Sequence, residues 1–293
     1  MRIAVVHEHP VGLPEAARPL AELGHELVSV SLAEADDPTA CLRRLGGADV
    51  VVHAVPLASG SSALWAAALA ERARLPYLGP SLASLVACTR RELWRAVCRA
   101  AGVPVPWGRS VPAISALRGR RVPLPAAVGR PERARMAWSR QDLLRAVEQA
   151  LGEEGGPVWV EEATPGRRFA VALLGERALA AAEVDQDGTV RRRGPLPAAL
   201  AGTLVAHVQA VAPILLSPAP GLVWFAWDGL RAPRLLRPDP APDLSPTGLF
   251  AACAAREGWS LAAVWRTALA WSSPAGTAHG RREPGPSMAP PGR

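Results

Sequence analysis

The chain has 293 residues, of which 49% are hydrophobic and 20% are charged. This composition excludes a disordered protein, and the length fits roughly two or three packed units. The net charge of +7 comes from arginine alone, because the sequence contains no lysine, so any mechanism that requires a lysine is excluded. A nucleic-acid partner is not favoured, because the arginines are dispersed and Tyr and Phe are scarce. Coding pressure in a GC-rich genome, with the arginines on the solvated surface, explains the arginine excess better than nucleic-acid binding does.

The first quarter of the chain alternates predicted strands with predicted helices. Apolar, largely β-branched runs predict buried strands at 2–6, 27–32 and 48–55. Helices are predicted between them at 14–27, with a stop near Gly24, and at the alanine-rich residues 61–76. Strands that alternate with helices form parallel crossovers, so residues 1–83 predict a small Rossmann-like α/β domain.

The middle and last parts of the chain predict a mixture of helices and short strands. An amphipathic helix is expected at 90–101, ended by Gly102, and a helix with Asp142 near its start at 140–151. Strands are expected at 157–164 and 169–184, and two short strands around a turn within 123–138. A helix at 197–214 precedes a predicted hairpin, 222–227 and 233–238, which turns at Asp228-Gly229. Closing helices are predicted at 249–258 and 261–271.

Cysteine use and the N-terminal sequence indicate a cytoplasmic protein. The four cysteines form no CxxC pair and have no histidine at zinc-ligand spacing, which indicates buried, reduced thiols. The N-terminal residues lead directly into a strand without the features of a signal peptide, and no apolar stretch reaches the ~20 residues that span a bilayer. We therefore expect no membrane partner. His7 and His9 flank Glu8 after the first strand, a pattern more typical of ordinary loop residues than of metal ligands.

Three motifs, in this order, resemble the D-alanine:D-alanine ligases. LPYLGPS at 75–81 and RRELWRAVCRAAGVPVPWG at 90–108 resemble a Pro-Tyr-x-Gly turn followed by a basic helix that ends in Gly-[Ile/Leu]-Pro. PVWVEEATPGRRFAVALLGERAL at 157–179 resembles the family's nucleotide-hinge strand. LRPDPAPDLSPTGLFAACAAREGWSLAAVW at 236–265 resembles its C-terminal signature and the two helices that follow.

The resemblance implies an α/β protein with an ATP-grasp fold. It implies a Rossmann-like preATP-grasp domain at 1–83, a central ATP-grasp subdomain at 84–163 and a C-terminal ATP-grasp subdomain at 164–271. Residues 272–293, rich in Pro, Gly, Ser and Arg, are predicted to be a disordered tail. The implied activity joins a carboxylate to an amine through an acyl phosphate. It uses ATP, two Mg²⁺ ions held by carboxylates and an asparagine, and two lysines, because phosphoryl transfer requires charge neutralisation.

Most of the side chains that this chemistry requires are replaced. Across the resemblance, the metal positions fall on Trp224, Arg237 and Asp239, and only Asp239 offers an oxygen ligand, which makes a poor magnesium site. Leu222 stands at the position of the substrate-carboxylate arginine, Arg168 at that of the ribose-binding acid, and a lysine position falls near Ala127. Residues 130–136 replace the phosphate lid, and the first-domain loop at 55–63 keeps only Gly60.

A few features of the family persist and supply the candidate site residues. Arg91 and Arg95 occupy helix positions where the resemblance implies phosphate-facing cations, and Glu161 stands at the adenine hinge. Glu15 lies near the position of an acid that binds the substrate ammonium, and Asp239 is the candidate metal ligand. The alternative is that Arg91 and Arg95 lie on an exposed helix face and that Glu161 merely ends a strand.

The leading hypothesis is a pseudoenzyme that keeps the scaffold for binding or regulation, with an anion or nucleotide site near Arg91 and with Trp224 filling the vacated metal site. The rival is an active ATP-dependent ligase whose metal site is rebuilt around Asp239, Asp243 or Asp228. A third class is a basic protein that docks nucleic acid or a protein partner, with the arginine-bearing tail as the candidate element. A homodimer or another protein partner remains open.

Overall fold

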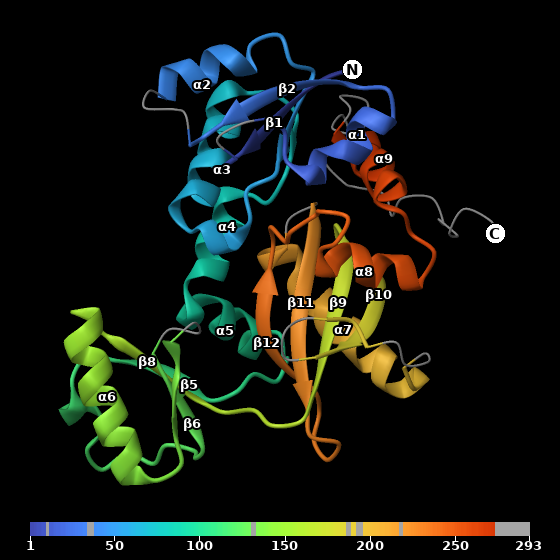
Figure 1. Ribbon diagram of the computed structural model, residues 1–293. Coiled ribbons are helices and arrows are strands. Elements are labelled where there is room, and N and C mark those ends of the chain that lie inside the picture. The colour runs from blue at the N-terminus through green and yellow to red at the C-terminus, as the bar shows by residue number, and fades with distance from the viewer. Residues whose placement is uncertain are drawn as a thin grey trace.

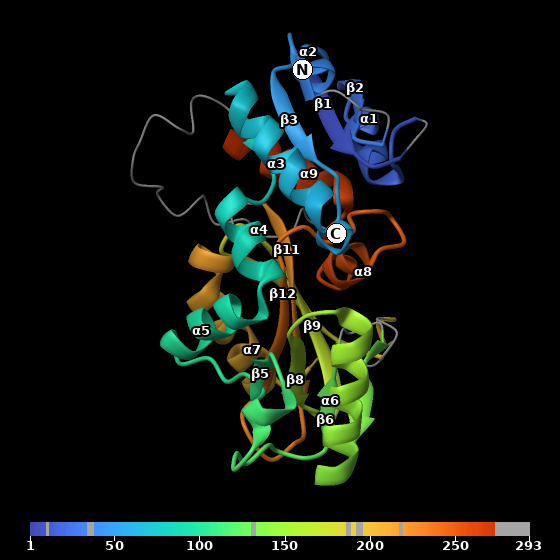
Figure 2. The same ribbon diagram turned by 90° about the vertical axis from the view of Figure 1, so that its left-hand side faces the viewer.

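The computed structural model describes residues 1–9, 12–33, 38–129, 133–185, 189–191, 196–216 and 219–272. This part of the chain contains three four-stranded sheets. In both views the first sheet lies at one end of the molecule, the second lies at the other end, and the third lies between them (Figure 1, Figure 2). Most of the predicted tail (273–293) and the first three residues of the predicted lid replacement (130–132) lie outside the described residues.

The first sheet is parallel and buried on both faces. Its strands are β1 (Arg2–His7), β2 (Glu26–Ser31), β3 (Val50–His53) and β4 (Tyr77–Leu78), in the order β2-β1-β3-β4. Helices α2 (Pro38–Leu45) and α3 (Ser61–Ala73) cover one face, and α1 (Arg18–Glu22) and α9 (Leu261–Ser272) cover the other. Side chains of β1 alternate accordingly, because Ile3 and Val5 pack toward α1 and α9 while Ala4 and Val6 pack toward α2 and α3.

The second sheet is antiparallel and has a helix on one face only. Its strands are β5 (Gly108–Val111), β6 (Ala126–Val128), β7 (Arg135–Ala137) and β8 (Val158–Glu162), in the order β5-β8-β6-β7. Helix α6 (Arg140–Glu154) begins with a capping box formed by Ser139 and Asp142, so the predicted acid near its start is confirmed. Leu143 and Val147 of α6 pack against Val158 and Val160. The alternate residues of β8 therefore face away from α6.

The third sheet is antiparallel and covered on both faces. Its strands are β9 (Arg167–Leu174), β10 (Arg177–Val184), β11 (Pro220–Trp227) and β12 (Arg234–Asp239), in the order β10-β9-β11-β12. Phe169, Val171 and Leu173 pack with α7 (Ala198–Leu215), α4 (Leu82–Thr89) and α5 (Arg91–Ala100). Ala170, Ala172 and Leu174 pack on the opposite side with α8 (Leu249–Arg256) and α9.

Helix α7 is the one helix of the described residues that is long and apolar enough to cross a membrane, judged by length and composition alone. Its buried residues include Leu200, Leu204, Val208 and Val211, which pack in the core beside the third sheet. This core packing accounts for the apolar composition of the helix.

The second and third sheets are joined by residues 163–166, between β8 and β9. Gly166 ends this connection with φ +110°, and a Cβ there would lie 2.2 Å from the carbonyl oxygen of Trp227. Only glycine fits this close approach of two backbones. The connection therefore brings the end of β8 beside the start of β9, where the candidate site lies.

Candidate functional site

Two arginines and two tryptophans stack beside the end of β8, and we call Arg91, Trp94, Arg95 and Trp159 the arginine–tryptophan column. The guanidinium carbon of Arg95 lies 4.8 Å from the ring centroid of Trp94 and 5.1 Å from that of Trp159. The guanidinium carbon of Arg91 lies 5.6 Å from the ring centroid of Trp159. Cations over ring faces attract the ring quadrupole, so the column ties α5 to β8.

Arg95 is held in a buried ion pair. Its side chain is 2% exposed, and its Nη2 donates to Glu161 Oε2 at 2.5 Å while its Nη1 donates to the carbonyl oxygen of Pro106 at 2.5 Å. Trp159 Nε1 donates to the same Glu161 oxygen at 2.8 Å. Burial lowers the pKa of Arg95, and the nearby Glu161 carboxylate opposes this shift. These contacts commit both charges to the protein itself.

These contacts correct part of the sequence interpretation. The alternative that Arg95 lies on an exposed helix face is wrong, because tertiary contacts with β8 bury it. Arg91 is half-buried and lies over the Trp159 ring, so it is the more accessible of the two arginines. Nucleotide-binding roles for Arg91, Arg95 and Glu161 stay predictions.

A second group of cations lies on the third sheet, on the side away from α7. Trp224 of β11 and Arg237 of β12 are directly paired across the strands, and the Arg237 guanidinium carbon lies 5.3 Å from the Trp224 ring centroid. Arg168 lies on the same side of the neighbouring strand β9, because it pairs with Ala226, two residues beyond Trp224. We call these three residues the Arg168–Trp224–Arg237 face. Burial lowers the pKa of Arg168 and Glu161 opposes the shift, which places Arg168 near the end of β8.

The residues of this face do not fit a magnesium ion. Magnesium requires a near-octahedral set of oxygen ligands, whereas Trp224 offers none and Arg237 offers a positive charge. Asp239 is the remaining acid on the strand, and its Oδ1 accepts a hydrogen bond from the amide of Ala241 at 3.2 Å. Burial raises the pKa of Asp239, while Arg237 partly opposes this. Asp239 as a metal ligand stays a prediction, and it would act without the other two ligands.

The three acids named by the rival hypothesis do not gather into one group. Asp228 lies at the turn between β11 and β12, at the opposite end of the hairpin from Asp239, and accepts from the amides of Leu230 and Arg231 at 2.9 Å each. Asp243 accepts from the amide and hydroxyl of Ser245 instead. In the part of the chain that the structure describes, no group of three or more His, Cys, Asp or Glu side chains is placed to hold a metal. A single metal site built from all three acids is therefore absent from the described residues, whereas a metal role for any one of them stays a prediction.

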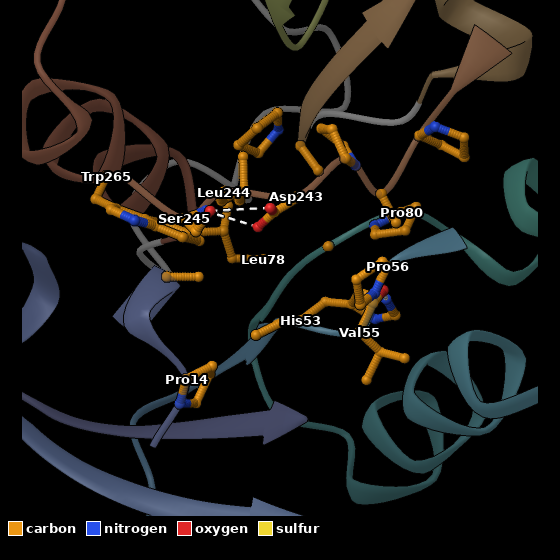
Figure 3. Close-up of a pocket in the computed structure, with 18 of the residues that line it drawn as sticks. Pro14, His53, Val55, Pro56, Leu78, Pro80, Asp243, Leu244, Ser245 and Trp265 are labelled. Carbon is orange, nitrogen blue, oxygen red and sulfur yellow. Dashed lines mark hydrogen bonds between the residues drawn. The ribbon is translucent and has the colours of Figure 1, made fainter. Parts of the chain in front are cut away.

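A cavity of ≈ 260 Å³ lies where the carboxyl ends of β3 and β4 meet the loop after β12. Figure 3 shows Pro14 and His53 on one side of it and Asp243, Ser245 and Trp265 on the other. Ligands of open α/β sheets bind outside the carboxyl ends of the strands, which makes this cavity a candidate binding site. Glu15, the predicted ammonium-binding acid, lines this cavity and is exposed. Its substrate role stays a prediction.

His53 lines the same cavity and was not singled out by the sequence analysis. Its Nε2 donates to the carbonyl oxygen of Val55 at 2.7 Å, and its Nδ1 lies 2.8 Å from the hydroxyl of Tyr77. Burial lowers the pKa of His53 to about 4, so the ring is neutral at pH 7 and its Nδ1 accepts a hydrogen bond from the Tyr77 hydroxyl. The available signal was a histidine that ends a strand of three valines.

A second, more open cavity of ≈ 910 Å³ lies beside the β11–β12 turn. Exposed arginines Arg99, Arg121 and Arg231 line it, and Arg234 Nη1 donates to Glu162 Oε1 at 2.6 Å on its wall. The third hypothesis requires arginines that gather on one surface, and this cavity gathers some of them. Docking of a partner there stays a prediction.

The four cysteines Cys41, Cys88, Cys98 and Cys253 are free and buried, as predicted. Burial raises the pKa of Cys98 and of Cys253 to about 12. Both thiols are therefore protonated at neutral pH and behave as small apolar core residues.

Comparison with known proteins identifies the fold. No family model and no curated protein sequence matches the chain. Among solved structures, D-alanine–D-alanine ligase from Bacillus anthracis complexed with ATP matches with a TM-score of 0.74 and 15% identity, over 93% of this chain and 96% of that one. The VanG D-Ala:D-Ser ligase from Enterococcus faecalis matches with a TM-score of 0.72 and 14% identity, over 93% and 99%. An L-amino acid ligase from Bacillus licheniformis matches with a TM-score of 0.69 and 15% identity, over 92% and 74%. The predicted ATP-grasp fold is thus confirmed.

Proposed function

We propose that this ATP-grasp chain binds small ligands without catalysing ligation, as a pseudoenzyme with a binding or regulatory role. Three ligases of known structure share its fold, and one of them is complexed with ATP. Within this proposal, residues 1–83 form the Rossmann-like domain, and 84–163 and 164–271 form the two ATP-grasp subdomains. The cytoplasm is the proposed location.

The Trp224–Arg237 pair is the observation that carries the proposal. Ligation through an acyl phosphate needs divalent cations beside the transferring phosphoryl group. The Arg237 guanidinium carbon lies 5.3 Å from the Trp224 ring centroid on two adjacent strands, so a cation and an apolar ring stand at positions for which the resemblance implies oxygen ligands. The chain also contains no lysine to supply the remaining ammonium groups.

Binding remains well supported on the same scaffold. The 260 Å³ cavity beside Glu15 and His53 is large enough for a small metabolite. Among the described residues its walls carry the acids Glu15 and Asp243 and no arginine, which favours a ligand that bears an amine. Arg91, Arg168 and Arg237 supply positive charge elsewhere, which favours an anionic second ligand.

Release of ADP from Mg·ATP in the presence of amino acids, singly and in pairs, tests the loss of catalysis. We expect no release above that of buffer over hours at micromolar protein. Steady turnover with any amino acid would refute the proposal. Binding of small amines, followed by calorimetry in the wild type and in Glu15→Gln, tests the binding role, and an affinity that is unchanged in the variant would contradict the assignment of Glu15.

The second candidate function is an active ligase of small amino acids or peptides. The formed cavity at the carboxyl ends of the strands favours it, because a small amino-acid substrate would fit the same space that the proposed ligand occupies. It would have to transfer phosphate with arginines in place of both lysines and with a metal site built around Asp239, Asp243 or Asp228. The same ADP assay separates the two candidates.

A further inference from the structure

We propose that the Arg168–Trp224–Arg237 face, with Arg91, binds the phosphate groups of a polyphosphate anion, such as the triphosphate of a nucleotide, in its metal-free form. This inference rests on the proposed function, because it describes how the non-catalytic site binds its anion. The guanidinium groups then replace the divalent cation as the source of positive charge.

The arginines of this site have free hydrogen-bonding capacity. Among the described residues, no carboxylate lies within ion-pair distance of Arg91, Arg168 or Arg237. Arg168 is half-buried, which makes an unpaired guanidinium costly, and an anion would offset that cost. Arginine binds phosphate oxygens through two parallel N–H groups, so each free guanidinium is a complete phosphate ligand.

Neighbouring contacts hold these arginines in place. Arg237 lies over Trp224 and Arg91 lies over Trp159, so each guanidinium has a ring that restrains it. Arg95 fixes Glu161 by the ion pair at 2.5 Å, and Trp159 donates to the same carboxylate. Glu161 is therefore already neutralised, and it does not repel an anion that approaches Arg168.

The charge of the site predicts an unusual response to magnesium. Four guanidinium groups, Arg91, Arg95, Arg168 and Arg237, stand against the carboxylates of Glu161 and Asp239, and burial disfavours the charged form of Asp239. A polyphosphate with bound Mg²⁺ carries two fewer negative charges, and its metal would approach the Arg237 cation. Magnesium should thus weaken binding, whereas a site built from carboxylates requires the metal.

Calorimetric titration of the full chain with ATP, in EDTA and then in excess Mg²⁺, tests the inference. We expect ATP to bind in EDTA and to bind at least about five-fold more weakly with Mg²⁺. Inorganic tripolyphosphate should compete with ATP in EDTA, because the phosphates carry the interaction. Tighter binding of Mg·ATP, no binding of ATP in EDTA, or failure of tripolyphosphate to compete would each overturn the inference. These titrations measure binding only. The ADP assay measures catalysis, so failure of this inference and failure of the proposed loss of catalysis can be told apart.

Variants locate the site. Arg168→Gln and Arg237→Gln should each weaken binding of metal-free ATP about ten-fold, which is the effect of one charge-assisted hydrogen bond. Arg237→Gln should also reduce the difference between the two titrations. Arg72→Gln, at an exposed position on α3, is the matched control and should bind ATP as the wild type does. Wild-type affinity in both folded site variants would overturn the assignment.

Discussion

Arg95 and Glu161 are 66 positions apart in the sequence, yet the guanidinium and the carboxylate form an ion pair with 2.5 Å between Nη2 and Oε2. Arg95 lies on α5, which packs with the third sheet, whereas Glu161 lies at the end of β8 in the second sheet. The pair therefore joins the second sheet to a helix that packs on the third sheet. Its integrity should govern both stability and ligand binding.

Glu161→Gln should lower the free energy of unfolding by about 3 kcal/mol. The substitution leaves the guanidinium of Arg95 buried without a counter-charge, and breaking a buried ion pair from one side is strongly destabilising. Urea denaturation followed by tryptophan fluorescence measures the change, because Trp94 and Trp159 contact the pair.

Glu22→Gln supplies the matched control. Arg18 and Glu22 form an i,i+4 pair at 3.0 Å whose side chains are 75% and 58% exposed. Exposed pairs contribute little, so this substitution should change the free energy of unfolding by less than about 0.5 kcal/mol. Equal losses in the two variants would show that the burial of Arg95 is not what makes its pair important.

The local sequence predicts much of the fold because the strands are strongly patterned. The valine-rich runs of β1 and β3 and the hairpin of β11 and β12 were predicted close to their observed positions. Four α-helices and strands were missed: α2, β4, α4 and β5. Helix α4 (LASLVACT) has few polar residues to reveal a helical period, although Ser81 caps it by accepting from the amide of Ser84. The predicted helix at 14–27 is only a 3₁₀ turn, Glu15–Ala17, and the five-residue α1; the predicted stop near Gly24 is confirmed by its φ of +81°.

The site was less predictable than the fold because its contacts are long-range. The sequence indicates that Trp224 and Arg237 replace metal ligands, and their cross-strand register then follows from the hairpin. Nothing local indicates that Arg95 is buried while Arg91, four residues earlier on the same helix, stays half-exposed. The pairing of His53 with Tyr77 likewise depends on the parallel register of β3 and β4, which places strand ends together.

Gly108→Ala should destabilise the protein by about 1–3 kcal/mol, because it overfills a packed site. A Cβ at this position would lie 2.8 Å from Arg95 Nη1 and 2.8 Å from a ring carbon of Trp159. The methyl group therefore needs space that the arginine–tryptophan column occupies. Thermal and urea denaturation measure the loss.

Gly202→Ala tests whether that effect is steric. Gly202 lies within α7 and is exposed, and a methyl group added there would meet no atom of another part of the described chain within 4 Å. Alanine is the better helix former, so this variant should gain about 0.5–1 kcal/mol. Destabilisation of similar size at both positions would contradict the packing argument at Gly108.

His53 should make the protein less stable as the pH falls from about 6.5 toward 4. The unfolded state binds a proton on this side chain below its ordinary pKa of 6.5, whereas burial lowers the pKa in the folded state to about 4. Between these values the unfolded state holds more protons, so acid favours unfolding. The expected loss from this group between pH 7 and pH 5 is about 2 kcal/mol.

His53→Gln removes the titrating group while the amide can still donate to Val55 and accept from Tyr77. Urea denaturation at pH 7 and pH 5 should show a smaller difference in the variant than in the wild type. Tyr77→Phe should keep the wild-type pH dependence, because the imidazole stays buried. An unchanged pH dependence in His53→Gln would mean that other groups account for all of it.

Restoring oxygen ligands at the replaced positions should restore divalent-cation binding. In the double variant Trp224→Glu and Arg237→Glu, the new carboxylates face each other across β11 and β12, beside Asp239. Three oxygen-bearing side chains on one side of a sheet satisfy more of the coordination that Mg²⁺ and Mn²⁺ demand. Titration with Mn²⁺, followed by the loss of the free-ion resonance signal, should show binding at least about ten-fold tighter than in the wild type.

The matched control is Trp224→Gln with Arg237→Gln, which removes the same ring and guanidinium without adding charge. If this control binds Mn²⁺ as tightly as the glutamate variant, the tighter binding comes from the removal of Arg237 and not from the added carboxylates. The glutamate variant should still release no ADP from ATP, because the chain contains no lysine to complete the charge around the phosphates. Turnover in that variant would instead mean that the two metal positions alone separate this protein from an active ligase.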